Sequence, residues 1–258
     1  MKAVILAGGL GSRISEETIL RPKPLIEIGS MPIIWHIMKI YSFFGIKEFI
    51  ICCGYKGYLI KEYFANYSLH LSDVTINILK NTVTVHKKNA EDWKITLVDT
   101  GENTLTGGRI LRIKNYVKED FFLTYGDGVA NINIKKLLEF HKFNKKLATV
   151  TVVKPRGRYG VVKVDRKTNL ITTFEEKSIS ENSWINGGFF VLKTGIFKYL
   201  KDDDTVWEKE PLENLSNNNQ LAAYHHNDFW SAMDSLRDKN YLEKLWLSKK
   251  APWKLWNE

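Results

Sequence analysis

The chain begins Met1-Lys-Ala-Val-Ile-Leu-Ala7 and continues without a break as Gly8-Gly-Leu-Gly-Ser-Arg13. The apolar run at residues 2–6 is typical of a short buried strand, and the glycines after it require a tight loop. The run is too short for the apolar part of a secretory signal or for a membrane span, since charge returns at Arg13. We therefore expect these residues to form the first strand of an α/β fold, with no membrane attachment.

The residues that follow alternate between helix and strand signals. Pro32 opens a stretch whose apolar residues share one helical face, and Gly45 is expected to end that helix. A strand is expected over residues 48–52 and a second helix over residues 56–66. Strand, helix, strand and helix in this order predict a Rossmann-like, doubly wound sheet that is mostly parallel.

Residues 73–98 interrupt this alternation. Val74-Thr-Ile-Asn-Ile and Thr82-Val-Thr-Val switch between apolar and polar residues with the two-residue period of a half-exposed strand. Antiparallel strands commonly show that pattern. We therefore expect residues 73–98 to form antiparallel strands or an arm inserted in the sheet.

The second half of the chain is expected to be rich in strands. Strands are predicted at residues 121–124, 148–153, 159–164, 170–175 and 185–192, with a turn at residues 165–169. Helices are predicted near residues 134–144, 208–216 and 235–248. Because no repeat, low-complexity tract or linker separates these parts, we expect a single domain over residues 1–258.

The composition is that of an ordinary globular protein, with 258 residues, of which 44% are hydrophobic and 26% charged. A chain of this size needs neither a disulfide nor a structural metal to close its core. Its net charge of +9 is dispersed, and no stripe of interleaved basic and aromatic residues suggests a nucleic-acid partner. Two explanations of the charge remain open, namely solvated basic faces and phosphorylated substrates.

The two cysteines, Cys52 and Cys53, are adjacent in an apolar run. Neighbouring strand residues point to opposite faces, so a disulfide between them is not expected. Two buried thiols without a disulfide pattern favour a reducing compartment, and we expect a cytoplasmic protein.

The glycine-rich loop lies where the first strand ends, at the edge of an open α/β sheet where ligands bind. It is no dinucleotide fingerprint, because Ile14 stands where that motif needs glycine, and no Gly-Lys-Ser/Thr makes it a Walker loop. Its backbone N–H groups can approach oxygens closely, with Arg13 as a fixed cation. A plain strand-to-helix connection is the alternative interpretation.

Two further residues have a functional and an ordinary interpretation. Lys23 lies between Pro22 and Pro24, whose stiff backbone suits either a phosphate-binding lysine or a surface lysine in a turn. Asp127, inside Gly126-Asp-Gly128 after a buried strand, suits either a hard cation that bridges phosphates or an Asp-Gly turn.

In combination, these motifs resemble those of the nucleotidyltransferases that activate sugar 1-phosphates, and the resemblance runs along the whole chain. Phe174-Glu-Glu-Lys177 resembles the family's Phe-x-Glu-Lys-Pro, with Ser178 in place of proline, and Asn186-Gly-Gly188 resembles its sugar-binding Asn-x-Gly. Asp234 resembles the second metal aspartate, and a residue that only caps the helix that follows is the alternative interpretation. The resemblance implies the nucleotide-diphospho-sugar transferase fold, with a nucleotide-binding portion at about residues 1–130 and a β-rich sugar-binding portion at about residues 131–258.

Several segments resemble one branch of this family, the glucose-1-phosphate cytidylyltransferases. They are Asp99-Thr-Gly101, Thr106-Gly-Gly-Arg109, Trp35-His36, Cys52-Cys-Gly-Tyr-Lys56 and Lys250-Ala-Pro-Trp-Lys254. Ser12 departs mildly from the usual threonine. The resemblance implies that CTP and α-D-glucose 1-phosphate react to give CDP-glucose and pyrophosphate, with Mg²⁺ as cofactor.

The resemblance also implies a role for each matching residue. Arg13, Lys23 and Asp127 are the expected catalytic residues, and Asp127 and Asp234 the expected Mg²⁺ ligands. Glu176, Lys177, Asn186 and Gly188 are expected to contact the sugar phosphate. The expected nucleotide contacts are Leu6, Ala7, Gly8, Gly9, Leu10, Gly11, Ser12, Arg13, Lys23, Thr104, Arg109, Tyr125 and Gly126.

Two alternatives stay open at this point. The same chemistry with UTP or dTTP is one, and a nucleotide-sugar-binding regulatory subunit without turnover is the other. The presence of Arg13, Lys23, Asp127 and Asp234 together disfavours the second, since a binder does not need all four. The family also implies a homo-oligomer, with a hexamer as one form. None of the six histidines receives a role, and His225-His226 is expected at a strand end.

Overall fold

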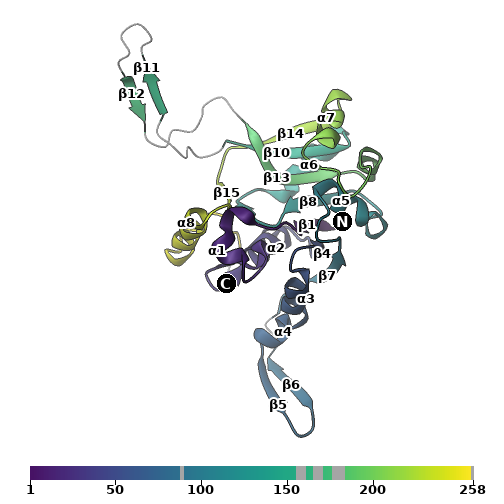
Figure 1. The fold of residues 1–258 in the computed structure, drawn as a ribbon, viewed down its shortest axis with the longest axis vertical. Coiled ribbons are helices and arrows are strands. Elements are labelled where there is room, and N and C mark those ends of the chain that lie inside the picture. The colour runs from purple at the N-terminus through teal and green to yellow at the C-terminus, as the bar shows by residue number, and fades with distance from the viewer. Residues whose placement is uncertain (88–89, 155–160, 165–170, 176–183, 257–258) are drawn as a thin grey trace.

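The computed structural model describes residues 1–87, 90–154, 161–164, 171–175 and 184–256. Seven strands form one sheet in the order β14-β10-β13-β8-β1-β4-β7 (Figure 1). Their bounds are β1 Ala3–Ala7, β4 Glu48–Cys53, β7 Lys94–Asp99, β8 Phe121–Tyr125, β10 Ala148–Val153, β13 Ile185–Leu192 and β14 Leu221–His226. Strand β13 runs antiparallel to β8 and β10, whereas the other neighbouring pairs are parallel. The prediction of a mixed, mostly parallel, doubly wound sheet is confirmed.

Helices cover both faces of this sheet. The longer ones are α2 Ile33–Phe43, α3 Gly57–Ala65, α5 Thr106–Arg112, α6 Ile134–Asn144, α7 Glu210–Asn217 and α8 Leu236–Leu247. The shorter elements are η1 Ser12–Ile14, α1 Ser15–Thr18, η2 Lys23–Leu25, α4 Tyr67–His70, η3 Lys114–Tyr116 and η4 Thr194–Tyr199. Within the described residues, no helix combines the length and apolar character that crossing a membrane requires.

Four two-stranded ladders lie outside the main sheet. They are β2 Glu27–Ile28 with β3 Met31–Pro32, β5 Asp73–Asn77 with β6 Thr82–Lys87, β9 Gly128–Ala130 with β15 Trp230–Ala232, and β11 Val161–Val164 with β12 Ile171–Glu175. All four are antiparallel. The turn expected at residues 165–169 lies outside the described residues.

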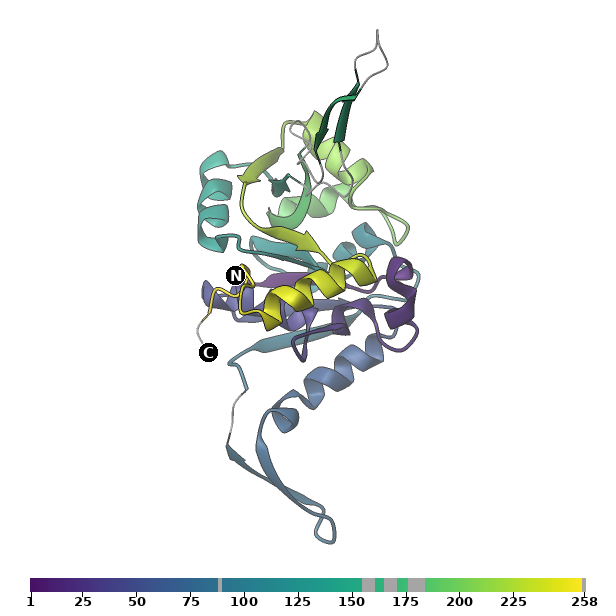
Figure 2. The same ribbon diagram turned by 90° about the vertical axis from the view of Figure 1, so that its left-hand side faces the viewer.

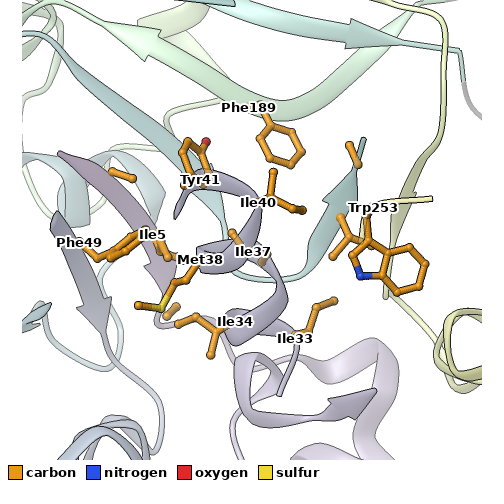
Figure 3. Packing of buried hydrophobic residues seen from close by; sticks show 14 of the residues in the cluster. Ile5, Ile33, Ile34, Ile37, Met38, Ile40, Tyr41, Phe49, Phe189 and Trp253 are labelled. Atoms are coloured by element: carbon orange, nitrogen blue, oxygen red, sulfur yellow. The ribbon is translucent and has the colours of Figure 1, made fainter. Parts of the chain in front are cut away.

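The sheet separates two hydrophobic clusters, because successive strand residues face opposite sides. In β1, Ile5 belongs to the cluster that contains α2, whereas Leu6 belongs to the cluster that contains Ile110 of α5. Cys52 and Cys53 divide between the clusters in the same way, and both are free thiols. Figure 3 shows the first cluster, where the apolar face of α2 lies against Ile5, Phe49, Phe189 and Trp253.

One sequence prediction needs a correction. Residues 73–87 form the expected antiparallel arm, but β7 at Lys94–Asp99 does not belong to it, because β7 pairs in parallel with β4 and forms an edge of the main sheet. An edge strand is exposed along part of its length, so its sequence resembles that of a half-exposed antiparallel strand. The sequence pattern therefore does not separate the two cases.

The chain order creates a switch point beside β1. From β1 the chain builds β4 and β7 on one side, and β8 then pairs with the other side of β1. In open α/β sheets, ligands bind at the carboxyl ends of strands where the order reverses in this way. The glycine-rich loop and Asp127 follow these two neighbouring strands.

Candidate active site

A cleft of about 640 Å³ opens at the carboxyl ends of β1 and β8. Leu6 and Tyr125 are register partners in these strands, and the Gly126 N–H donates to the Leu6 carbonyl at 2.9 Å. A Cβ at Gly126 would lie only 2.8 Å from that carbonyl oxygen, so glycine is required where the strands approach each other. Tight pairing of β1 and β8 thus brings the loop after each strand into one cleft.

The first loop forms one wall of this cleft. Gly11 has a φ of 66°, a left-handed conformation that suits glycine, and it precedes η1, which carries Arg13. The Thr18 hydroxyl donates to the Gly11 carbonyl at 3.2 Å and fixes the end of the loop. Leu10 in the same loop is 59% exposed and is not among the residues that line the cleft.

Three predicted residues meet at the cleft, although they are far apart in the sequence. The Lys23 Nζ lies 2.6 Å from Asp127 Oδ2 and 2.8 Å from Asp234 Oδ1. Burial alone would lower the pKa of Lys23, but the charges and hydrogen bonds of Asp127 and Asp234 outweigh it and raise that pKa above its ordinary value. Lys23 is therefore a charged cation between two carboxylates at neutral pH.

Arg13 reaches the same cluster from the loop. Its guanidinium lies 3.1 Å from Asp234 Oδ1 and 3.2 Å from Asp234 Oδ2, and the Arg13 side chain is 73% exposed. An exposed arginine beside a recessed lysine places one cation at the rim and one inside the cleft. This arrangement suits a ligand that carries several phosphates.

A small antiparallel ladder brings the two aspartates together. Strand β9 follows Asp127 directly and pairs with β15, so that Gly128 lies opposite Ala232. The Met233 N–H donates to the Asp127 carbonyl at 2.8 Å, which places Asp234 beside Asp127. Asp234 does not cap α8, because Ser235 occupies the N-cap and forms a capping box with Asp238.

The aspartate pair fits a hard divalent cation. Each carboxylate places an oxygen within hydrogen-bond distance of one ammonium group, so a cation already lies between them. Mg²⁺ is usually held by one or two carboxylates, with phosphate and water completing its ligands. No group of three or more His, Cys, Asp or Glu side chains within the described residues could hold a metal ion.

Arg109 is a buried residue of the cleft lining, and its guanidinium donates hydrogen bonds to the chain itself. It contacts the carbonyls of Gly8, Cys53, Gly101 and Glu102 and the hydroxyl of Thr100, at 2.6 to 3.3 Å. Burial, together with the nearby Arg112, lowers the pKa of Arg109 from its ordinary value. Arg109 thus ties the glycine loop to the segment after β7, and through both it shapes the predicted nucleotide wall.

Another part of the lining holds a hydrogen-bonded chain of side chains. Asn186 Nδ2 donates to the Tyr125 hydroxyl at 3.1 Å, and Asn186 Oδ1 accepts from the Gly188 N–H at 2.8 Å. The Tyr125 hydroxyl donates to Glu208 Oε1, and the Thr106 hydroxyl donates to Glu208 Oε2, both at 2.6 Å. Burial and the charge of Glu208 raise the pKa of Tyr125, so the tyrosine stays protonated as a donor. Glu208 therefore fixes Tyr125, and Tyr125 fixes Asn186.

Most predicted site residues that lie within the described ranges line this one cleft. Besides Arg13, Lys23, Asp127 and Asp234, the lining includes Leu6, Ala7, Gly8, Gly9, Gly11, Ser12, Thr104, Arg109, Tyr125, Gly126, Asn186 and Gly188. Leu10 is the exception, and Glu176 and Lys177 lie outside the described residues.

Sequence reasoning missed Glu208 and Trp230, which also line the cleft. Trp230 Nε1 donates to the Gly187 carbonyl at 2.7 Å and supports the Asn186–Gly188 segment. Glu208 lies in the charged run Glu208-Lys-Glu210, which resembles any solvated surface. No local signal separates it from its neighbours.

Sequence and structure comparisons relate the chain to known proteins. The family described as "Nucleotidyl transferase" matches residues 2–239. The chain is 55% identical over 258 residues to a glucose-1-phosphate cytidylyltransferase of Salmonella typhimurium (strain LT2), covering 99% of this chain and 100% of that protein. It is 46% identical, with the same coverage, to the "Probable glucose-1-phosphate cytidylyltransferase" of Bacillus subtilis (strain 168). Among solved structures, HddC from Yersinia pseudotuberculosis matches with a TM-score of 0.68 at 21% identity, covering 95% of this chain and 99% of that one.

Proposed function

Because the chain belongs to the nucleotidyl transferase family, within its glucose-1-phosphate cytidylyltransferase branch, we propose that it transfers a cytidylyl group from CTP to α-D-glucose 1-phosphate. The products are CDP-glucose and pyrophosphate. The observation that carries the proposal is the meeting of Lys23 with Asp127 and Asp234 in a cleft beside the glycine loop. A cation and two hard oxygen ligands at a switch point suit the binding of a triphosphate.

The proposed reaction is the nucleotidyl transfer that the family implies. A phosphate oxygen of glucose 1-phosphate forms a new bond to the α-phosphorus of CTP, and the bond from that phosphorus to the pyrophosphate oxygen breaks. The attacking oxygen is already anionic near neutral pH, so no general base is required. We assign Arg13 to the triphosphate and to the departing pyrophosphate. We assign Lys23 to the α-phosphate, where it stabilises the charge of the transition state.

Lys23 has to give up part of its present pairing to reach a phosphate. Its ammonium now bridges Asp127 and Asp234. We assign these aspartates to Mg²⁺, which when bound neutralises phosphate charge and orients the triphosphate. Before these carboxylates are engaged in that way, they raise the pKa of Lys23 and keep it protonated. A phosphate would then replace them as the anionic partner of its ammonium group.

The sugar side of the cleft supports glucose binding. We assign Asn186 and Gly188 to the sugar, oriented through Tyr125 and Glu208. Thr104, Arg109, Tyr125 and Gly126 stay assigned to the nucleotide, and all four line the cleft. Glu176 and Lys177 keep the sugar-phosphate roles that the family motif implies. Two further predictions remain, a single domain over residues 1–258 and a homo-oligomer.

The competing substrates differ in hydrogen bonding. Cytosine carries an exocyclic amino donor where uracil and thymine carry an acceptor, and a buried group that loses its partner costs roughly 1–3 kcal/mol. We expect kcat/KM with CTP to exceed that with UTP or dTTP by at least about tenfold.

Pyrophosphate release measured with CTP, UTP, dTTP and GTP over several sugar 1-phosphates tests the proposal, with CDP-glucose identified by mass spectrometry. Excess EDTA should abolish turnover, and added Mg²⁺ should restore it. Equal rates with all three pyrimidine triphosphates would refute the cytidylyl assignment. Binding of CDP-glucose without any pyrophosphate release would favour a regulatory subunit instead.

A further inference from the structure

Trp230 lines the cleft, yet the proposed chemistry gives it no role. It is the first residue of β15, the strand that pairs with β9 and leads into α8, the yellow helix at the front of Figure 2. The chain reaches Asp234, one of the two aspartates assigned to Mg²⁺, directly after this strand. The contacts of the Trp230 side chain show that β15 also supports a second part of the site.

Strand β13 is irregular where it enters the cleft. Its pairing with β10 is regular as far as Phe190, and a regular continuation would place Val152 opposite Gly188. Val152 lies opposite Asn186 instead, so β13 contains extra residues at this point and forms a bulge. Neither Gly187 nor Gly188 has a register partner in the described strands β8 and β10. The bulge thus takes the backbone of both glycines out of the ladder.

The indole of Trp230 binds the backbone that the bulge displaces. Trp230 Nε1 donates to the Gly187 carbonyl at 2.7 Å, in a partly buried position. A buried backbone carbonyl without a donor is costly, so this bond favours the bulged conformation. The Gly188 N–H closes the turn within the bulge by donating to Asn186 Oδ1 at 2.8 Å. Asn186 and Gly188, the two residues assigned to the sugar, thus flank the carbonyl that Trp230 holds.

Neighbouring residues hold the backbone of Trp230 in place. The preceding carbonyl, that of Phe229, accepts from the Asn131 N–H at 3.2 Å and hydrogen bonds with Nε2 of the buried His226 at 3.0 Å. Trp230 itself lies opposite Ala130 in the β9–β15 ladder. The indole N–H is therefore presented to the bulge from a fixed strand.

We propose that Trp230 is a positioning residue for the sugar subsite. The inference rests on the proposed function, because it requires that Asn186 and Gly188 contact the glucose. Trp230 acts through the Gly187 carbonyl, which fixes where the bulge places these two residues. The metal subsite does not depend on this bond, since the backbone pairs of β9 and β15 hold the two aspartates together. Loss of the indole N–H should therefore impair sugar recognition and spare the binding of nucleotide and Mg²⁺.

Trp230→Phe removes the N–H and keeps an aromatic ring, so its steady-state kinetics test the proposal. We expect the KM for glucose 1-phosphate to rise about three- to tenfold, the range for one hydrogen bond. The KM for CTP and the Mg²⁺ concentration for half-maximal turnover should stay within about twofold. Trp93→Phe is the matched control, since Trp93 Nε1 donates to Ser42 Oγ at 3.1 Å outside the cleft lining. It should leave all three values within about twofold.

The choice of sugar separates positioning from general destabilisation. Galactose 1-phosphate differs from glucose 1-phosphate in the configuration of one ring hydroxyl. If the bulge sets the sugar contacts, Trp230→Phe should lower the ratio of kcat/KM for glucose 1-phosphate to that for galactose 1-phosphate at least about threefold. A variant that merely loosened the fold would lower both values together. An unchanged ratio, or equal rises in the KM for CTP and for glucose 1-phosphate, would overturn the inference.

A second variant keeps the test valid if the smaller phenylalanine prevents folding, which circular dichroism detects. Benzothienylalanine at position 230 has the ring shape of tryptophan, with sulfur in place of the N–H, so it removes the donor without leaving a cavity. It should shift the KM for glucose 1-phosphate as Trp230→Phe does. A KM within about twofold of that of the unmodified protein would overturn the inference.

Calorimetry distinguishes a failure of this inference from a failure of the proposed function. It measures the dissociation constants of CDP-glucose and of CDP whether or not the chain turns over. Trp230→Phe should weaken the binding of CDP-glucose about three- to tenfold and leave that of CDP within about twofold. Equal affinity of the variant and the unmodified protein for CDP-glucose would overturn the positioning role, even if pyrophosphate release supports the proposed reaction. Absence of pyrophosphate release would refute that reaction and leave this binding test intact.

Discussion

At the scale of single residues, Lys23 joins groups that the chain keeps far apart. It lies 104 positions from Asp127 and 211 from Asp234, yet its ammonium contacts both carboxylates. Burial opposes the charged form of Lys23, and the two carboxylates restore it. The residue can therefore serve as a fixed positive charge where a phosphate is to be transferred.

Replacement of this cation should affect turnover more than substrate binding. We expect Lys23→Ala to lower kcat by roughly 10²–10³, the usual effect of losing a preorganised electrostatic donor. Lys39→Ala is the matched control, since Lys39 also pairs with a carboxylate, Glu91, at 3.3 Å but lies outside the cleft lining. Steady-state kinetics on both variants make the comparison. A kcat for Lys23→Ala within about twofold of the unmodified protein would rule out its role in the transition state.

Glu208 should matter through the residues that it holds. A glutamine at position 208 has one acceptor oxygen for two hydroxyl donors, so Glu208→Gln should loosen Tyr125 or Thr106. We expect the KM for glucose 1-phosphate to rise by about three- to tenfold, the range for one hydrogen bond, with a smaller change for CTP. Glu210→Gln is the control, since Glu210 pairs with Lys201 outside the cleft lining. Equal changes in both KM values would point to a general structural effect.

At the scale of elements, the β9–β15 ladder assembles the carboxylate pair. Its strands are three residues each, and they join the segment after β8 to the segment before α8. The capping box of Ser235 and Asp238 fixes where α8 begins, which leaves Asp234 free of a capping role. Two short strands and one helix start thus place Asp127 and Asp234 against the same ammonium.

If both aspartates bind one Mg²⁺ ion, loss of either one should remove most of the ion's effect on turnover. We expect Asp127→Asn and Asp234→Asn each to impair turnover severely, and the double variant to be only slightly worse. Asp92→Asn, at a carboxylate that is 90% exposed, is the control for a lost surface charge. Turnover should be measured over a range of Mg²⁺ concentrations, because a lost ligand raises the concentration required. If the fold loss of turnover in the double variant equals the product of the two single losses, the two aspartates act on separate steps.

At the scale of the whole molecule, the C-terminal segment closes the core around a buried histidine. Trp253 is fully buried, and its Nε1 donates to His36 Nδ1 at 3.3 Å, whereas His36 Nε2 bonds the Ile28 carbonyl at 2.8 Å. The Trp246 ring lies against the same histidine, 4.6 Å between centroids. The chain end thus completes a core whose other members come from α2 and the strands.

This closure predicts a pH dependence of stability. Burial lowers the pKa of His36 from 6.5 to about 4, so the native state keeps it neutral where the unfolded chain binds a proton. The neutral, buried His36 contributes fully to the free energy of unfolding above pH 6.5. This contribution is lost as the pH falls from 6.5 to 4, and about 2 kcal/mol of it is lost between pH 7 and pH 5. Urea unfolding followed by tryptophan fluorescence at several pH values measures the loss. His36→Gln should flatten the curve over this window, and an unchanged slope would contradict the assignment.

The sequence by itself determined the fold class and most element positions. Helices and strands follow from hydrophobic period and from residues such as Pro32 and Gly45, which act within a few positions of where they stand. The same local logic singled out Arg13 in the loop after the first strand, Lys23 between two prolines downstream of it, and Asp127 after a later buried strand. Resemblance to a family then supplied Asp234 and the choice among sugar nucleotides, which periodicity does not contain.

Only the tertiary structure decided which of these residues meet. That β7 belongs to the sheet rather than to the arm depends on pairing with β4, which the sequence of an edge strand does not reveal. Glu208 becomes a site residue because Tyr125 and Thr106 converge on it, although its own neighbourhood resembles ordinary surface. Arg109 holds the chain through contacts to segments up to 101 positions away. Hydrophobic pattern acts locally, whereas hydrogen bonds between distant segments exist only once the sheet has formed, and so the geometry of the site is a property of the fold.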